Sequence, residues 1–282
     1  MHSRTLPYGL LLCAAAMLPA AAQRVHKEFP LTNERELVVI VDVSFGTLVF
    51  ERGPKGMAAV VEFEDREDHE DRLQVTYDAD VRGKLRIKSK KSSRVWDRDE
   101  DGYERRIVVK CSYEVPLSIE LELGAGKGEL DMTGLQVQDL RVSTGASDVK
   151  LWCNQLNPIL AEQVDIESGV SKFTAENLSN LNFRKLKFSG GVGSYNLDFG
   201  GRLQQDAEAS IEVGLGAIVV NVPTDIDARL SYDDNWFSQF TLSSDFSRKK
   251  SGVYETEGYG DSRHRLNLKI DSGLGSVKIR RR

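Results

Sequence analysis

The sequence predicts an all-β protein, built as a β-solenoid-like stack of short strands with repeats of about 22 residues and glycine corners. Three observations support this class. A glycine-centred motif recurs six times, with an apolar residue three positions before the glycine. Val, Ile, Leu and aromatic residues alternate with polar ones around each copy, as in strands. Convincing helical periodicity is absent.

Residues 1–22 have the three regions of a secretory signal peptide. Arg4 gives a basic start, an apolar stretch runs from Leu10 to Leu18, and small alanines end at Ala22. The apolar stretch is too short and alanine-rich for a membrane anchor. A lipoprotein site at Cys13 is disfavoured because bulky Leu12 precedes it. We therefore expect cleavage near Ala22 and an extracytoplasmic protein, located in the periplasm, on the cell surface or secreted, with no transmembrane segment.

Residues 23–116 form an N-terminal β region without the strict motif. Within Leu37–Phe50 lies a degenerate copy, Val43-Gly46-Phe50, with Leu48 where a small residue is expected. Alternation predicts further strands at Leu73–Tyr77, Leu85–Lys88 and Ile107–Val115. We interpret the charged stretches 62–72 and 88–94 as solvated loops or strand flanks, with a polar binding patch as the alternative.

Residues 117–282 form the Gly-cornered repeat domain. A small residue follows each corner glycine by two positions and an apolar residue by four, except that the first copy reaches its apolar residue at Leu130. The corner glycines are 21 to 24 residues apart up to Gly214, and the next interval is 59. The copies are Leu121-Gly124-Gly126, Val142-Gly145-Ser147-Val149, Ile166-Gly169-Ser171-Phe173, Phe188-Gly191-Gly193-Tyr195, Ile211-Gly214-Gly216-Ile218 and Ile270-Gly273-Gly275-Val277.

Each glycine is expected at a tight corner between two strands. There, a positive φ or the close approach of the neighbouring rung would exclude a Cβ atom. A phosphate-binding loop is disfavoured, because no Lys-Ser/Thr and no helix follows the glycines. The glycines are therefore predicted to serve stacking.

The long interval, residues 215–272, is expected to hide two or three degenerate rungs. Its strand candidates are Ala228–Tyr232, Trp236–Leu242 and Arg265–Lys269. It also concentrates aromatic residues, which we interpret as packing over the end of the stack, with a sugar- or protein-binding platform as the alternative. These residues are Tyr232, Trp236, Phe237, Phe240, Tyr254 and Tyr259.

The segment Asp97–Gly102 matches the first half of a calcium loop, with alternating carboxylates before a glycine. Val108 stands where the loop's final glutamate belongs. A charged hairpin tip is therefore favoured, and calcium binding would need ligands from elsewhere.

The two cysteines outside the signal peptide, Cys111 and Cys153, fall on the apolar phase of their strands. Two rungs in register would separate their Cα atoms by ~9 to 10 Å, too far for a disulfide. Buried free thiols are favoured, and a bridge requires different packing of the N-terminal strands.

Catalytic, cofactor-binding and metal-binding residues are not predicted, and no cofactor is expected. His26, His69 and His264 are scattered without metal-ligand spacing, and His69 lies in an acidic run. No Ser, Cys or His stands in a recognisable catalytic setting. The formal net charge of −5 argues against nucleic acid as a partner.

Four segments carry a resemblance to a known family: Glu120 to Gly126, Val142 to Val149, Phe188 to Tyr195 and Ile270 to Val277. In corner residues and spacing the chain resembles the bacterial toast-rack family of proposed adhesins, which is related to the C-terminal domain of cell-wall-active-antibiotic response proteins. The resemblance covers about Cys111 to Ile279. It implies an extracytoplasmic stack of β-strands with a binding, structural or envelope-stress role.

The leading functional hypothesis is an exported non-enzymatic scaffold that contacts proteins or the cell envelope, adhesin-like or associated with envelope stress. The alternative is a carbohydrate-binding or polysaccharide-acting β-helix, which requires acidic and aromatic side chains such as Asp97 and Trp236 to converge on one face. A regulatory partner of a membrane sensor is a third hypothesis. Function is expected where the repeat fails.

The stacked-corner interpretation predicts that Gly191→Val lowers the melting temperature far more than the surface change Glu122→Gln, because only the first adds side-chain atoms at a corner. Equal melting temperatures for the two purified variants would reject stacked corners.

Overall fold

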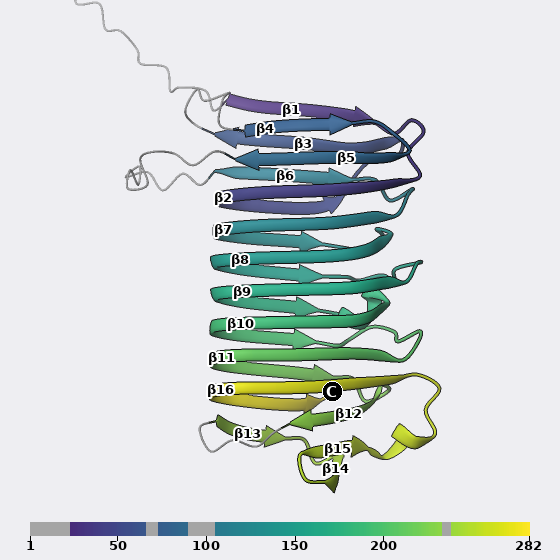
Figure 1. Ribbon diagram of the computed structural model, residues 1–282, viewed down its shortest axis with the longest axis vertical. Helices are drawn as coiled ribbons and strands as arrows, with labels where there is room; N and C mark the ends of the chain where they lie inside the picture. Colours follow the sequence, from purple (N-terminus) through teal and green to yellow (C-terminus); the bar gives the residue numbers. More distant parts are fainter. Residues whose placement is uncertain (1–22, 66–72, 90–104, 233–237) are drawn as a thin grey trace, which may run out of the picture.

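The computed structural model describes residues 23–65, 73–89, 105–232 and 238–282 (Figure 1). These residues form sixteen strands and two short 3-10 helices, η2 (Leu178–Leu181) and η3 (Glu257–Gly260). The strands are β1 (Gln23–Pro30), β2 (Glu36–Arg52), β3 (Met57–Asp65), β4 (Leu73–Asp78), β5 (Arg82–Ser89), β6 (Arg106–Cys111), β7 (Leu117–Asp131), β8 (Val137–Trp152), β9 (Ala161–Glu176), β10 (Phe183–Asp198), β11 (Ala207–Val222), β12 (Asp227–Tyr232), β13 (Ser238–Leu242), β14 (Phe246–Lys250), β15 (Val253–Thr256) and β16 (Arg265–Arg281).

Seven long strands form the stack: β2, β7, β8, β9, β10, β11 and β16, each 15 to 17 residues long. They pair in parallel in that order, and each folds back at its middle, along the left edge of Figure 1. Each long strand thus supplies two sides of one rung. The all-β, stacked-strand class predicted from the repeat is confirmed.

Alternating side chains of every long strand fill one continuous core. Parallel register aligns equivalent apolar residues into columns, so that Phe188 lies between Ile166 and Ile211 on the neighbouring strands. Aromatic rings pack both between and within rungs: the ring centroids of Phe173 on β9 and Phe188 on β10 are 5.6 Å apart, and those of Phe188 and Tyr195, on the two halves of β10, are 5.2 Å apart. The core therefore depends on keeping every rung in the same register.

Two columns of small residues run along the corner edge, the edge where the long strands fold back. In the first column, a Cβ on Gly145 would lie 2.2 Å from the carbonyl oxygen of Gly124 on the preceding rung. In the second, a Cβ on Gly216 would lie 1.9 Å from the oxygen of Gly193, and φ of Gly216 is +141°. The predicted role of the glycines in stacking is confirmed, since the next backbone occupies the space of a side chain.

The register corrects two details of the repeat. Gly46 pairs with Gly126, so the N-terminal copy is centred two residues earlier, and Ser44 stands in the first column. Leu130 pairs with Leu151, so it is not a late motif residue; Gly128 occupies the column of Val149. Two glycine columns only two residues apart make the motif's register ambiguous in sequence.

Asparagine side chains tie the remaining turns of the stack together. The Asn157 side chain accepts a hydrogen bond from the Val137 amide (3.1 Å) and donates to the carbonyls of Val137 and Leu181 (2.7 and 3.0 Å). Asn180 donates to the Cys153 carbonyl at 2.9 Å. These bonds satisfy backbone groups where the strand ladders end.

Both ends of the stack finish in a split rung. At the N-terminal end, β5 pairs with the first half of β2 and β6 with the second half. At the other end, β12 and β13 pair with the two halves of β16. The segments between the halves, 90–104 and 233–237, lie outside the described residues.

The 59-residue interval was expected to contain two or three rungs. It forms one split rung and a hairpin instead. The chain leaves β11, forms β12 and β13, turns through the antiparallel pair β14 and β15, and returns as β16. β16 then lies between β11 and the split rung. Gly273 is therefore the immediate neighbour of Gly214, whose carbonyl oxygen a Gly273 Cβ would meet at 2.4 Å.

Cys111 and Cys153 are free and buried, as predicted. Their separation is larger than the sequence spacing suggested, because β2 and β7 both lie between β6 and β8. Three strand spacings correspond to roughly 14 Å, well beyond disulfide reach. The division of the chain at residue 116 stays a prediction, and β2 and β7 pair closely across it.

Changing Gly216 to Ala is expected to destabilise the stack by about 3 kcal/mol, because it combines a backbone clash with a strained positive φ. The melting temperature should fall by roughly 6–12 °C. The matched control is Gly260→Ala, where a Cβ meets nothing within 4 Å. A Gly216→Ala variant as stable as the control would contradict close backbone contact at the corner.

Candidate functional site: the corner edge

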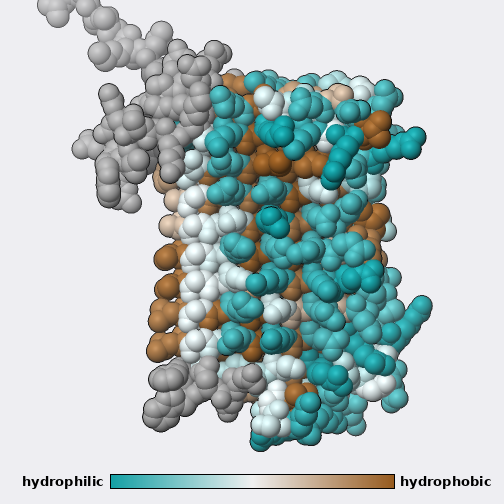
Figure 2. All heavy atoms as spheres, viewed as in Figure 1, coloured by the Kyte–Doolittle hydropathy of each residue, from teal (hydrophilic) through white to brown (hydrophobic). Residues whose placement is uncertain are grey.

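A straight row of apolar side chains lies exposed between the two small-residue columns. Register aligns one residue per long strand, and we call this set the corner row. Its members are Phe45, Ala125, Ala146, Val170, Val192, Leu215 and Leu274. Figure 2 shows apolar side chains stacked along this edge beside a column of small residues. An aligned series of this kind is unlike the scattered single apolar residues of ordinary surfaces.

The corner itself forces these side chains outward. Inward positions on β11 are Val213 before the bend and Ile218 after it, both buried. Leu215 is at the vertex between them and is 44% exposed; Val170, at the same position on β9, is 64% exposed. Because the flanking residues are glycine or serine, the described neighbours in the two small-residue columns leave the large side chains of the row exposed.

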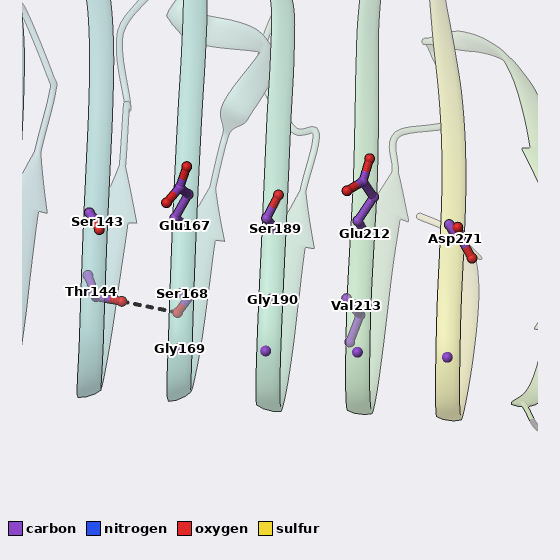
Figure 3. Close-up of a pocket in the computed structure, with 13 residues that line it drawn as sticks. Ser143, Thr144, Glu167, Ser168, Gly169, Ser189, Gly190, Glu212, Val213 and Asp271 are labelled. Carbon is purple, nitrogen blue, oxygen red and sulfur yellow. Dashed lines mark hydrogen bonds between the residues drawn. The ribbon is translucent and has the colours of Figure 1, made fainter.

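A shallow open trough runs beside the corner row, along the first small-residue column. Its volume is about 670 Å³, and it crosses β8 to β11 and β16 (Figure 3). Glycine backbone forms much of its lining, and polar side chains project along one side. The lining residues are Ser143, Thr144, Glu167, Ser168, Gly169, Ser189, Gly190, Gly191, Glu212, Val213, Gly214, Asp271 and Gly273.

Charged side chains flank the row on both sides. On the trough side, a column two residues before the corner glycines carries carboxylates, including Glu167, Glu212 and Asp271. On the other side, two residues beyond the row, the column contains Lys172 and Asp148, which are 3.6 Å apart. The edge is therefore apolar at its crest and acidic along the trough.

Hydroxyl groups near the trough are bonded within the corner. Thr144 Oγ1 and Ser168 Oγ are 3.1 Å apart, and Ser168 also hydrogen-bonds Ser171 (Figure 3 shows the first bond). The Tyr195 hydroxyl donates to the Gly169 carbonyl at 3.4 Å, and burial raises the pKa of this phenol. These groups stabilise the bend.

Burial also raises the pKa of both thiols, to about 12 for Cys153. Such thiols remain protonated and are poor nucleophiles. In the part of the chain that the structure describes, no group of three His, Cys, Asp or Glu residues is placed to hold a metal ion.

Several sequence-predicted features fall outside the described residues: Asp97–Gly102, His69, Trp236 and Phe237. The other aromatic residues of the long interval pack in the cap, as expected. Tyr232 stacks on Phe240 with centroids 4.1 Å apart, Phe240 contacts Tyr254, and Tyr259 is buried. Among the described residues that line the trough there is no aromatic ring, so acids and rings do not come together in this lining. His26 bonds Glu28 at an exposed position, far along the chain from His264.

Sequence reasoning missed the corner row. Its signal was the middle residue of each Gly-x-Gly or Gly-x-Ser corner, which is Ala, Val or Leu in all six copies. The glycines on either side form the stronger pattern in the sequence, so the residue between them does not stand out.

The chain belongs to the family described as the N-terminal domain of toast_rack, DUF2154. The family model matches residues 19–176 and 152–221, more than half of the chain. The match therefore includes the N-terminal region, which lay outside the expected span of Cys111 to Ile279. The fold is accordingly a toast-rack β-repeat scaffold.

Solved structures that match this chain include a proposed cell adhesion protein from Clostridium sporogenes, 18% identical, with a TM-score of 0.48 over 93% of this chain and 100% of the other. A proposed adhesin from Bacteroides fragilis is 15% identical, with a TM-score of 0.42 over 93% and 98%. A proposed lipid-binding protein from Parabacteroides distasonis is 12% identical, with a TM-score of 0.28 over 92% and 96%.

None of the curated proteins matches this chain. Among the described residues, no helix is long and apolar enough to cross a membrane.

Glu34 is a buried carboxylate remote from the corner edge, and it lies in the loop that joins β1 to β2. It accepts hydrogen bonds from the Thr32 amide (2.6 Å) and the Tyr77 hydroxyl. Desolvation raises its pKa, but the bonds from Tyr77 and Thr32 together outweigh this effect, so the pKa is lowered below 4.5.

Because the folded-state pKa of Glu34 is depressed, its ionisation stabilises the fold above the unfolded pKa, and this contribution is lost as pH falls through the folded value. We expect Glu34→Gln to be less stable than the parent at neutral pH and to lose less melting temperature on acidification. The measurement is thermal unfolding from about pH 7 to about pH 3, with exposed Glu120→Gln as control. Identical pH profiles for Glu34→Gln and the parent would exclude this role.

Proposed function

We propose that this chain is an exported, non-enzymatic scaffold whose corner edge contacts a protein or another component of the cell envelope. The observation that carries the proposal is the corner row, an aligned series of exposed apolar side chains. Its five large members, Phe45, Val170, Val192, Leu215 and Leu274, are 44% to 64% exposed. Exposed apolar series of this length are typical of contact surfaces.

The backbone holds the row rigidly. Parallel ladders run on both sides of the bend, so each corner residue from Ala125 to Leu215 is fixed by its neighbours on two adjacent rungs. The spacing along the row is the strand spacing, ~4.8 Å. A partner therefore meets a preformed surface and pays little entropy to order it.

Export rests on the signal-peptide pattern of residues 1–22. Its test is the N-terminal sequence of the protein recovered outside the cytoplasm, expected to begin at Gln23. Recovery of the intact N-terminus from the cytoplasm would contradict export.

A non-enzymatic role is supported by what the titratable and nucleophilic groups do. Thr144, Ser168 and Ser171 bond one another inside the corner, and both thiols are kept protonated by burial. The bonded hydroxyls and the buried thiols therefore have structural roles. The carboxylates of the trough face open solvent.

The contact role predicts that the purified mature chain sediments with envelope fractions of the producing cells. Substituting Glu for both Val192 and Leu215 should reduce the bound amount about tenfold, because a charge in the row must be desolvated on contact. The matched control is Val81→Glu, which is also at an exposed valine (57%) but away from the row. Equal binding by both variants and the parent would refute a contact function for the corner edge.

A further inference from the structure

The corner edge is complementary to itself. Each copy presents an apolar ridge, the corner row, directly beside a trough lined by glycine backbone. The ridge protrudes from the surface, and the trough beside it is recessed. Two copies related by a two-fold axis would place the ridge of each in the trough of the other, which is an isologous contact.

The repeat spacing also matches, because ridge and trough are formed by the same strands. The trough crosses β8 to β11 and β16, and the ridge carries a large aliphatic residue on four of these strands, β9, β10, β11 and β16. A two-fold axis between β10 and β11 therefore places every large aliphatic ridge residue of that segment opposite a trough glycine of the other copy. The facing pairs are Val170 with Gly273, Val192 with Gly214, Leu215 with Gly191 and Leu274 with Gly169.

Charges agree with this arrangement. The same axis brings the trough-side column of one copy opposite the far-side column of the other. Asp271 then faces Lys172 of the second copy, twice by symmetry, while Glu167 and Glu212 face Ser276 and Ser194. No carboxylate of these four rungs faces another carboxylate. Lys172 keeps Asp148 as its partner within the chain.

We infer that the corner edge is the contact surface between two antiparallel copies of this chain, with the ridge of each seated in the trough of the other. This inference rests on the proposed contact function and names the partner as a second copy. The overlap is short, four rungs or roughly 19 Å at ~4.8 Å per strand. It lies at the small end of specific interfaces, so the dimer is weak and forms where copies are concentrated.

An anionic membrane surface fits the edge less well. Glu167, Glu212 and Asp271 line the same side as the trough and would approach the lipid headgroups together with the ridge. Like charges repel across such a contact. Binding of the edge to vesicles is therefore an outcome that contradicts the dimer.

The test is sedimentation equilibrium of the mature chain from about 10 µM to about 1 mM. The mean mass should rise from monomer toward dimer across this range. The double variant Val192→Glu, Leu215→Glu should weaken association about tenfold or more, while Val81→Glu should leave it unchanged. Both substituted sets lie at exposed positions, and circular dichroism of each variant confirms folding.

A charge exchange between Asp271 and Lys172 distinguishes the specific pairing from nonspecific association. Asp271→Lys and Lys172→Asp should each weaken association, because each places like charges opposite one another, and the double exchange should restore it. A parent chain that stays monomeric throughout, a dimer insensitive to the row, or a double exchange no better than the singles would each overturn the inference. So would row-dependent flotation of the monomer with phosphatidylglycerol vesicles.

The two proposals fail separately. A monomeric chain that still sediments with envelope fractions through the row would overturn the dimer alone. A row-dependent dimer that does not bind those fractions would overturn the envelope contact and leave the dimer standing.

Discussion

Close contact between consecutive backbones at the corner is the constraint on which the rest of the structure depends. The carbonyl oxygen of one rung occupies the position that a Cβ of the next would need, at Gly145, Gly193, Gly216 and Gly275 alike. This contact fixes the register of both halves of every long strand at once. The core columns, the corner row and the trough all follow from that register. Ser147 and Ser171 stand in the second column, and neither has a positive φ. This column therefore accepts a small side chain at positions where φ is not positive.

The sequence was a good guide to the fold because its repeat encodes a physical requirement. Only glycine or a small residue fits at the corner, so the spacing of the glycines predicted stacking. The ends were harder to predict. At Gly46 the two glycine columns are confused in a linear reading, and at Gly128 a glycine replaces the apolar residue of the Val149 column, since the register that separates these columns exists only between strands. The return of β16 into the stack is likewise a pairing choice that leaves no local pattern.

The site was less predictable than the fold. Each corner-row residue looks like an ordinary apolar position in a β-rich sequence, and alternation gives its direction only where a strand is straight. At the bend, the inward positions Val213 and Ile218 are five positions apart, an odd step, and Leu215 between them turns outward. The direction of Leu215 therefore follows from the bend rather than from its hydrophobicity. The aromatic residues of the long interval, by contrast, pack as predicted. Tyr232 and Tyr259 point inward, as the composition of a cap suggests.

The place of β16 has a consequence for how the molecule is completed. The last strand of the chain lies inside the sheet, and the described strands of the cap join the stack only through it. A chain that emerges N-terminus first from a ribosome or an export channel can lay down β7 to β11 in order, each on its predecessor. It cannot seal this end of the stack until β16 is in place. Loss of β16 would therefore open an interior seam between β11 and β12, not shorten an edge.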